Sequence, residues 1–237
     1  MSEPNEPYPG PTGEPTPAGA APAYGAAYGA AQPYYAPSTA GRPKDLRLTG
    51  WLSVGAAAAV TVSSIVDAML VGGAIRDPGV EETTSLLYGA KALLYFLLLV
   101  GAYVVTCLWL TQARDNARTI DPEFHHARRS GWIWGGWVCP IVNFWFPFQV
   151  VRDVYRPAAR EPGASPTIGL WWTAWVVLIV VSRIADRLSQ RALDGATGNG
   201  AEAASAVLAV ITVVALVLWA MVVRQVTTVQ HRALGLS

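Results

Sequence analysis

The sequence predicts an all-α integral membrane protein with four transmembrane helices, one proline-broken re-entrant or interfacial helical segment, and a disordered N-terminal tail. Three observations indicate this fold class. First, 52% of the 237 residues are hydrophobic and only 14% are charged, whereas soluble domains carry about 25% charged residues. Second, four apolar runs approach or exceed the roughly twenty residues that a helix needs to cross a bilayer. Third, these runs lack the period-two alternation of a membrane β-barrel, so helices must satisfy their backbone hydrogen bonds in lipid.

The N-terminal tail differs in composition from the rest of the chain. The first 43 residues hold ten of the 17 prolines and no Leu, Ile, Val, Phe or Trp. Such a segment has too little apolar area to offset the entropy of ordering its backbone, so residues 1–46 are expected to form a disordered Pro/Gly/Ala/Tyr-rich cytoplasmic tail. It also lacks the basic start and apolar stretch of a secretory signal peptide. The tail serves either as a solvated spacer or, through its tyrosines, as a contact for protein partners or for self-association. Those tyrosines are Tyr8, Tyr24, Tyr28, Tyr34 and Tyr35.

The helical membrane domain is expected over residues 47–237. Its four spans are predicted at residues 48–75, 86–112, 168–185 and 203–223. One acidic residue interrupts the first span and one basic residue interrupts the second, while the third carries an arginine near its end and the fourth contains no charge. Four crossings of the membrane follow from these runs.

Residues 130–156, SGWIWGGWVCPIVNFWFPFQVVRDVYR, decide the topology. The stretch opens with 22 uncharged residues, which is enough to cross a bilayer. If it does not cross, the inner side of the membrane holds twelve of the 17 Lys and Arg residues and the outer side four; if it crosses, the division is ten against six. The positive-inside rule therefore favours a segment that does not cross, in a multi-pass protein of the cell membrane with both termini cytoplasmic.

Local chemistry in residues 131–151 also favours a broken helix. Pro140 and Pro147 each remove a backbone donor, and Asn143 lies between them where the chain can turn. Asn143 and Gln149 are expected either to satisfy backbone groups freed by the prolines or to contact a ligand. The expected structure is a descending half-helix, a turn and a return to the cytoplasmic face, and the alternative is a kinked helix that lies flat in the inner interface. Because protein must cover backbone that turns in lipid, the four spanning helices are expected to pack around this segment.

Asp67 and Lys91 are the first candidates for a site, since charged residues within a span are costly and often functional. At 1.5 Å per residue, Asp67 lies roughly 12 Å and Lys91 roughly 8 Å from the outer ends of their spans, so the two side chains can meet. The functional interpretation is a relay for ions or protons. The alternatives are a structural ion pair, or a Lys91 side chain that extends to the surface with Asp67 at the helix end.

The loop that follows the second span contains two adjacent histidines. His125 and His126 can form a metal site with Asp121 and Glu123, although adjacent histidines in a charged loop are more often solvated. No metal or cofactor is assigned on this basis. The sequence contains no phosphate-binding glycine loop, paired catalytic carboxylates or nucleophile elbow, so no catalytic residue is predicted.

The lipid bilayer is the main expected partner. A basic collar at the inner face is predicted to attract anionic lipid headgroups, at about 1 kcal/mol per basic residue. A net charge of +1 argues against a nucleic-acid-binding protein. Cys107 and Cys139 both lie in apolar runs and are expected to behave as small buried hydrophobic residues. The collar consists of Arg114, Asp115, Arg118, Arg128 and Arg129.

Three stretches resemble one known family when they are taken together. They are LWLTQARDNA at the end of the second span, GWIWGGWVCPIVNFWFPFQVVRDVYR, and GLWWTAWVV at the start of the third span. This set is similar to the pattern of an actinobacterial multi-span membrane family known as a domain of unknown function, DUF4328, over roughly residues 48–225. The resemblance implies a multi-span membrane protein with a Pro-, Gly- and Tyr-rich tail. It implies no activity and no catalytic residues.

Three functions are compatible with the sequence. The favoured one is a non-enzymatic scaffold or interaction protein of the cytoplasmic membrane, which presents its tail to partners. The alternative is a small transporter or channel-like protein built around the re-entrant segment, because broken helices commonly line transport sites. The third is a membrane enzyme that acts on lipid, for which the sequence offers no reactive constellation.

Overall fold

The computed structural model describes residues 42–76, 84–160, 163–194 and 199–236. Within these ranges the protein is helical and has no strand. The predicted all-α fold class is therefore confirmed. The predicted tail lies almost entirely outside the described residues.

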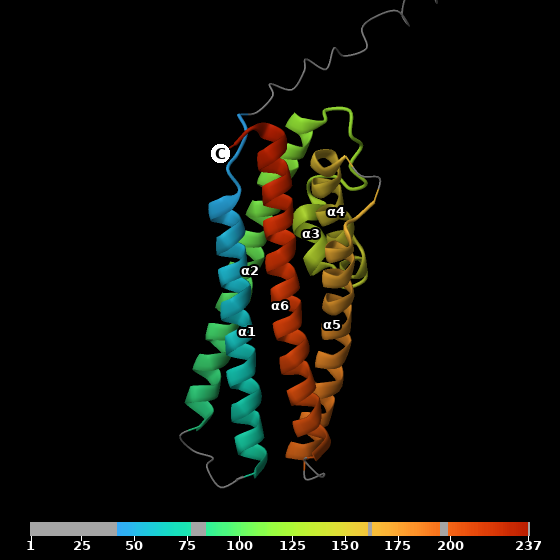
Figure 1. The fold of residues 1–237 in the computed structure, drawn as a ribbon. Helices are drawn as coiled ribbons and strands as arrows, with labels where there is room; N and C mark the ends of the chain where they lie inside the picture. The colour runs from blue at the N-terminus through green and yellow to red at the C-terminus, as the bar shows by residue number, and fades with distance from the viewer. Residues whose placement is uncertain (1–41, 77–83, 161–162, 195–198, 237) are drawn as a thin grey trace, which may run out of the picture. The chain divides into compact units, whose positions relative to one another are not determined.

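Four long helices form the body of the bundle. Each contains a segment that is long and apolar enough to cross a membrane, which confirms the predicted number of spans. Helix α1 packs against α2 and α6, and α6 packs in turn against α5 (Figure 1). All described residues belong to one compact unit. The four helices are α1 (Arg47–Arg76), α2 (Thr84–Ile120), α5 (Pro166–Leu193) and α6 (Asn199–Leu234).

Helices α2 and α6 continue well past the ends of the predicted spans. Helix α2 ends at Ile120 and α6 at Leu234, because helical hydrogen bonding does not stop where the apolar run stops. Polar side chains in these extensions pack inside the protein: Asn116 is 1% exposed and Gln230 is 0% exposed. The predicted spans end earlier than these helices, since hydropathy counts only the apolar residues of a span and not the polar turns that continue the helix beyond it.

The segment between α2 and α5 forms the short helix α3 (Trp132–Val138), a 3₁₀ turn (Val142–Phe144) and helix α4 (Phe146–Ala159). Helix α3 is about 10 Å long and cannot cross a hydrocarbon layer of about 30 Å. Cys139 has an extended backbone with ψ of 114°, as expected for the residue before a proline. Pro147 lies in the first turn of α4, where its missing N–H breaks no helical hydrogen bond.

The broken segment enters and leaves the bundle at one end. We call this the collar end, where α1 and α5 begin and α2 and α6 end. Helix α4 packs there against α2, α5 and α6 (Figure 1). Two hydrogen bonds to α6 tie the chain after the turn to this end: Ser165 Oγ donates to Gln225 Oε1 at 2.9 Å, and Gln230 Nε2 donates to the Val154 carbonyl at 2.7 Å.

The expectation that the four spanning helices pack around residues 131–151 is met by α2, α5 and α6, which pack against α4, but not at the tip of the segment. Helix α3 packs against α2, α4 and the 3₁₀ turn, and the tip of the segment is open, with Val138 69% and Ile141 72% exposed. The tip does not need a protein cover because local hydrogen bonds satisfy its backbone, including Asn143 N to Cys139 O at 3.0 Å and Trp145 N to Val142 O at 3.1 Å. The protein covers α4 instead, whose apolar face is buried.

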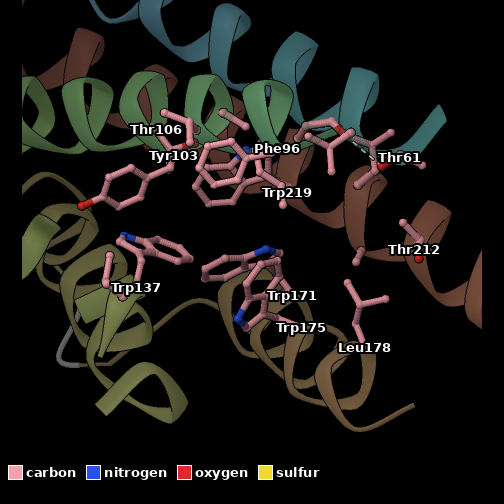
Figure 2. A pocket seen from close by; sticks show the side chains of 18 residues that line it. Thr61, Phe96, Tyr103, Thr106, Trp137, Trp171, Trp175, Leu178, Thr212 and Trp219 are labelled. Carbon is pink, nitrogen blue, oxygen red and sulfur yellow. Dashed lines mark hydrogen bonds between the residues drawn. The ribbon is translucent and has the colours of Figure 1, made fainter. Parts of the chain in front are cut away.

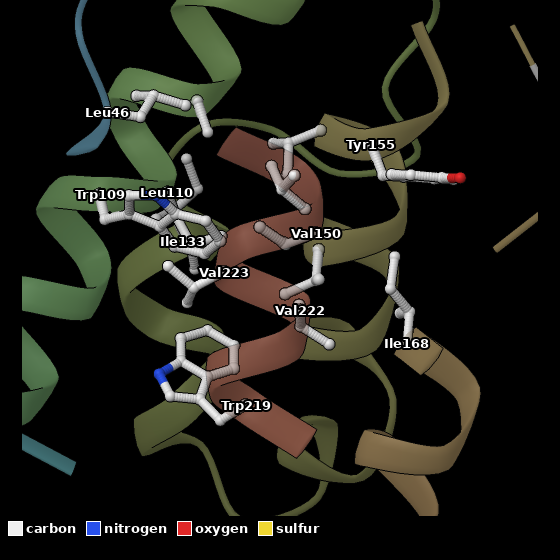
Figure 3. Close-up of a cluster of buried hydrophobic side chains, with 14 of the residues drawn as sticks. Leu46, Trp109, Leu110, Ile133, Val150, Tyr155, Ile168, Trp219, Val222 and Val223 are labelled. Carbon is white, nitrogen blue, oxygen red and sulfur yellow. The ribbon is translucent and has the colours of Figure 1, made fainter. Parts of the chain in front are cut away.

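The hydrophobic core lies at the collar end, where α4 packs against α2, α5 and α6 (Figure 3). Trp109 on α2 and Trp219 on α6 meet edge to face, with ring centroids 5.5 Å apart. Gly50 allows α1 to approach α6 closely, since a Cβ atom at this position would lie only 2.9 Å from Val223 Cγ1. This core fixes the ends of α2, α4 and α6 relative to one another.

Candidate functional site

Asp67 on α1 and Lys91 on α2 are brought together. Lys91 Nζ donates to Asp67 Oδ1 in an ion pair. The Lys91 side chain is 21% exposed and the Asp67 side chain is 50% exposed. The predicted contact between the two side chains is therefore present in the structure. A relay function for the pair stays a prediction.

The polar residues of the broken segment have other partners than expected. Gln149 Oε1 accepts a hydrogen bond from Arg128 Nε at 2.6 Å, and the Arg128 guanidinium lies 3.9 Å from the centroid of the Phe146 ring. Gln149 therefore positions an arginine and does not satisfy backbone groups freed by the prolines. The side-chain oxygen of Asn143 is buried without a hydrogen-bond partner among the described residues. Pro140 is exposed at the tip, while Pro147 is buried at the start of α4.

A buried polar cluster joins the α2–α3 loop to α4. Asp153 is 3% exposed, accepts a hydrogen bond from the Ala127 backbone N at 2.6 Å, and pairs with Arg152 at 2.8 Å. Arg114, 6% exposed, donates to the Arg128 carbonyl at 2.6 Å. Arg114 therefore holds the loop in place and is not displayed on the surface. Of the predicted collar, Arg118 and Arg129 are the exposed arginines.

The two adjacent histidines differ in environment. His125 is exposed, whereas His126 is partly buried. Among the described residues, neither ring nitrogen of His126 has a hydrogen-bond partner. Burial, together with the nearby positive charges of Arg114 and Arg118 and against the opposing charge of Asp153, lowers the pKa of His126 to about 4. Within the described part of the chain, no three His, Cys, Asp or Glu side chains lie close enough to hold a metal ion. The metal site considered for this loop is not formed.

The stem of the tail, residues 42–46, is anchored at the collar end. The Lys44 backbone N donates to Asn116 Oδ1 at 2.9 Å, and Asn116 Nδ2 donates back to the Lys44 carbonyl at 2.8 Å. Lys44 Nζ also pairs with Asp115 at 2.6 Å. Leu46 is fully buried, and its backbone N donates to His231 Nε2 at 3.1 Å. Sequence reasoning missed this anchorage, because its partners are 71 to 185 residues away from the stem.

A cavity of about 580 Å³ lies between α1, α2, α3, α5 and α6. Figure 2 shows Trp137, Trp171 and Trp175 on one side of it, opposite Tyr103 and Trp219. Its lining contains no charged side chain. Trp171 and Trp175 belong to the run GLWWTAWVV, whose tryptophans do not by themselves indicate a cavity.

The hydroxyl groups of the cavity lining are already engaged. Tyr103 donates to the Trp134 carbonyl at 3.0 Å, and Thr106 shares a hydrogen bond with Ser53 at 2.8 Å. Thr61 and Thr212 each donate to the carbonyl four residues earlier in their own helix, at 2.9 Å and 2.8 Å. The cavity is consequently apolar in character, although several of its side chains carry polar atoms.

The two cysteines do not share one environment. Cys107 is fully buried and its thiol donates to the Ile133 carbonyl at 3.3 Å, in agreement with the prediction. Cys139 is exposed, so the prediction of burial is wrong for this residue. It lies at the open tip of the broken segment, which no spanning helix covers.

Comparison with known proteins gives one match. No curated protein and no solved structure matches the chain. The model of a family described as a domain of unknown function matches residues 72–228, so most of the first span lies outside the match. Since this match covers more than half of the chain, the protein belongs to the DUF4328 family.

Proposed function

We propose that the protein is a non-enzymatic interaction protein of the cytoplasmic membrane, which presents its N-terminal tail to partners from a fixed point. The observation that carries the proposal is the anchorage of the stem to Asn116, Asp115 and His231. A tail that leaves the bundle at a fixed place keeps its binding residues within a limited distance of the membrane. That restriction raises their effective concentration for a partner that also contacts the membrane or the bundle.

The proposal requires the tail and the C-terminus to face the cytoplasm. Support comes from the arginines, because the collar end carries most of the basic residues, and from the return of α4 to that end. Cysteines introduced as Gly163→Cys and Gly235→Cys, in a background with Cys107→Ala and Cys139→Ala, should be labelled only from the cytoplasmic side. Gly200→Cys should be labelled only from outside. Labelling of Gly163→Cys from outside would contradict the arrangement.

The role of the tail can be tested by crosslinking and affinity capture from membranes. Deletion of residues 1–41 leaves the stem in place and should abolish partner recovery. The matched control replaces residues 1–41 by a Gly/Ser linker of equal length, which keeps a flexible spacer but removes the tyrosines and prolines. Recovery should be lost with this linker too. If the linker variant recovers the same partners as the full chain, the tail is a spacer and the proposal is wrong.

A small transporter or channel built around residues 131–151 is the second candidate. The cavity beside α3 favours it, but the lining is uncharged and its hydroxyls are engaged. Apart from the indole N–H of Trp175, which has no hydrogen-bond partner among the described residues, it offers little to replace the water around an ion or polar solute. Cysteines introduced as Ala57→Cys and Ala102→Cys should therefore stay unreactive toward a charged, water-soluble thiol reagent. Rapid reaction at both positions would favour the transporter.

A further inference from the structure

We propose that the apolar cavity binds one acyl chain of an anionic membrane phospholipid, which lies parallel to α2 and α5. This binding site is independent of the tail and goes beyond the proposed interaction function. The argument rests on where the cavity opens, how large it is, and which charges lie at its collar end.

The mouth of the cavity faces the hydrocarbon of the membrane. Phe96 and Val100 on α2 line the cavity and are 59% and 41% exposed, and Val138 at the end of α3 is 69% exposed. Phe96 and Val100 lie within the candidate span Gly89–Ile120. An occupant that enters between these side chains must therefore come from the lipid phase. Because lipid tails are as apolar as the lining, such an occupant is held by van der Waals packing against the side chains and not by burial away from water.

The length and volume of the cavity are sufficient for one extended hydrocarbon chain. Its lining on α2 runs from Phe96 to Thr106, which is about 15 Å along the helix axis. The cavity has a volume of about 580 Å³. A hydrocarbon chain in single file is only about 4.5 Å thick at van der Waals contact and needs about 240 Å³ over the same length. One extended chain fits, with room for bends.

The lining of the cavity is suited to a hydrocarbon chain, because it is mostly apolar and aromatic. Aromatic rings of Trp137, Trp171 and Trp219 provide broad apolar faces (Figure 2). The hydroxyl of Tyr103 is held by the Trp134 carbonyl, so a chain passing beside it leaves that donor satisfied. The indole N–H of Trp175 has no hydrogen-bond partner among the described residues. Ligand cavities with this predominance of apolar and aromatic lining are typical of sites for apolar groups.

Charge at the collar end selects an anionic headgroup. Helix α3, about 10 Å long, separates the cavity at Trp137 from the exposed Arg129 just before the helix. Arg118 is also exposed there, and its guanidinium donates to Ser130 Oγ at 3.4 Å. A chain that enters the cavity beside α3 thus places its headgroup near two arginines, each worth about 1 kcal/mol toward an anionic lipid.

The test is photocrosslinking of the full chain in bilayers that contain phosphatidylglycerol with a diazirine in one acyl chain, followed by mapping of the labelled residues. We expect labelling of cavity residues between Trp171 and Leu178 in the unaltered protein. Ala102→Trp fills the cavity from α2 and should reduce that labelling about tenfold, the effect of about 1.4 kcal/mol in binding free energy. Ala92→Trp, an identical change at an exposed alanine of the same helix, should leave it unchanged. Val100→Trp at the mouth gives a second variant that disturbs the interior less.

Three outcomes would overturn the proposal. Equal labelling of the cavity in the unaltered protein and in both filling variants would show that the lipid contacts only the outer surface. Labelling by a diazirine-bearing free fatty acid as strong as that by phosphatidylglycerol would show that the source is not the phospholipid. Crosslinks from Ala102 to a second protein chain, obtained with a photoreactive amino acid at that position, would identify a protein occupant.

Discussion

Gln230, near the end of α6, donates a hydrogen bond from Nε2 to the Val154 carbonyl of α4 at 2.7 Å. The same nitrogen donates to the Ala113 carbonyl of α2 at 2.9 Å. One fully buried amide thus joins three helices, and it holds the chain that follows the broken segment at the end where α2 leaves the bundle. This contact fastens the chain that follows residues 131–151 to the end of the bundle at which α2 ends.

Gln230→Leu should destabilise the protein. The change removes two hydrogen bonds, each worth about 1 kcal/mol, while a leucine of similar size keeps the volume filled. We expect a loss of about 1–3 kcal/mol in the free energy of unfolding, measured by denaturation in detergent micelles. Arg232→Leu, at an exposed position of the same helix, is the control and should change the stability by less than about 0.5 kcal/mol. Equal effects of the two changes would show that the amide does not hold the helices together.

Gly136 controls how closely α3 approaches α4. A Cβ atom at Gly136 would lie 3.2 Å from Phe146 Cβ, whereas one at the adjacent Gly135 would meet only the Trp132 ring at 3.5 Å. Gly136→Val should therefore reduce the free energy of unfolding by about 1–3 kcal/mol more than Gly135→Val, through overpacking. Because both variants place a valine in α3, the loss of helix propensity from a β-branched residue is the same in each and drops out of the difference. Equal destabilisation by the two changes would mean that α3 can move away from α4 without a loss of stability.

His126 should make the protein less stable in mild acid. Because its pKa is about 4 in the folded protein and about 6.5 when the chain is unfolded, only the unfolded chain takes up a proton between these values. The unfolded state binds more protons there, so the free energy of unfolding falls as the pH is lowered from 6.5 to 4, by up to about 3 kcal/mol. Above pH 6.5 this effect is absent.

Two variants isolate the contribution of His126. His126→Phe removes the titrating group without removing a hydrogen bond, since neither ring nitrogen has a partner, and should flatten the decline between pH 6.5 and 4. His125→Phe, at the exposed neighbour, should retain the decline. Chemical denaturation at a series of pH values measures both, and a decline of the same size in the two variants would assign it to other groups.

The Asp67–Lys91 pair should behave as a coupled unit. Removing one charge leaves the other without its partner in an apolar region, so Asp67→Asn and Lys91→Met should each be more destabilising than the double variant. Because half of the Asp67 side chain is exposed, we expect a coupling energy of about 1–3 kcal/mol, between the ranges for exposed and buried pairs. A double-mutant cycle on thermal unfolding measures it. Additive effects would indicate that Lys91 reaches the surface independently of Asp67.

Local properties of the chain account for what could be predicted. The four spans follow from the length and composition of apolar runs, and the broken segment follows from Pro140 and Pro147, because a proline acts on its own turn of backbone. The possible contact between Asp67 and Lys91 also followed from counting, since both lie at known distances from the same loop. None of these inferences required knowledge of which helix packs against which.

The environments of single residues could not be predicted in this way. His126 and Arg114 are polar residues in a charged loop or at a helix end, and only the position of α4 makes them buried. Cys139 lies in an apolar run, yet it is exposed because α4, rather than α3, takes the place among the long helices.

The sequence by itself determined that the chain is a helical membrane protein, where its helices lie, and which segment is broken, because hydrophobicity and backbone restrictions act between near neighbours in the chain. Only the tertiary structure decided the anchorage of the stem to His231, the joining of three helices by Gln230 and the cavity enclosed by Trp137, Trp171 and Trp219. Each of these depends on side chains that are distant in sequence and meet only because the helices pack against one another.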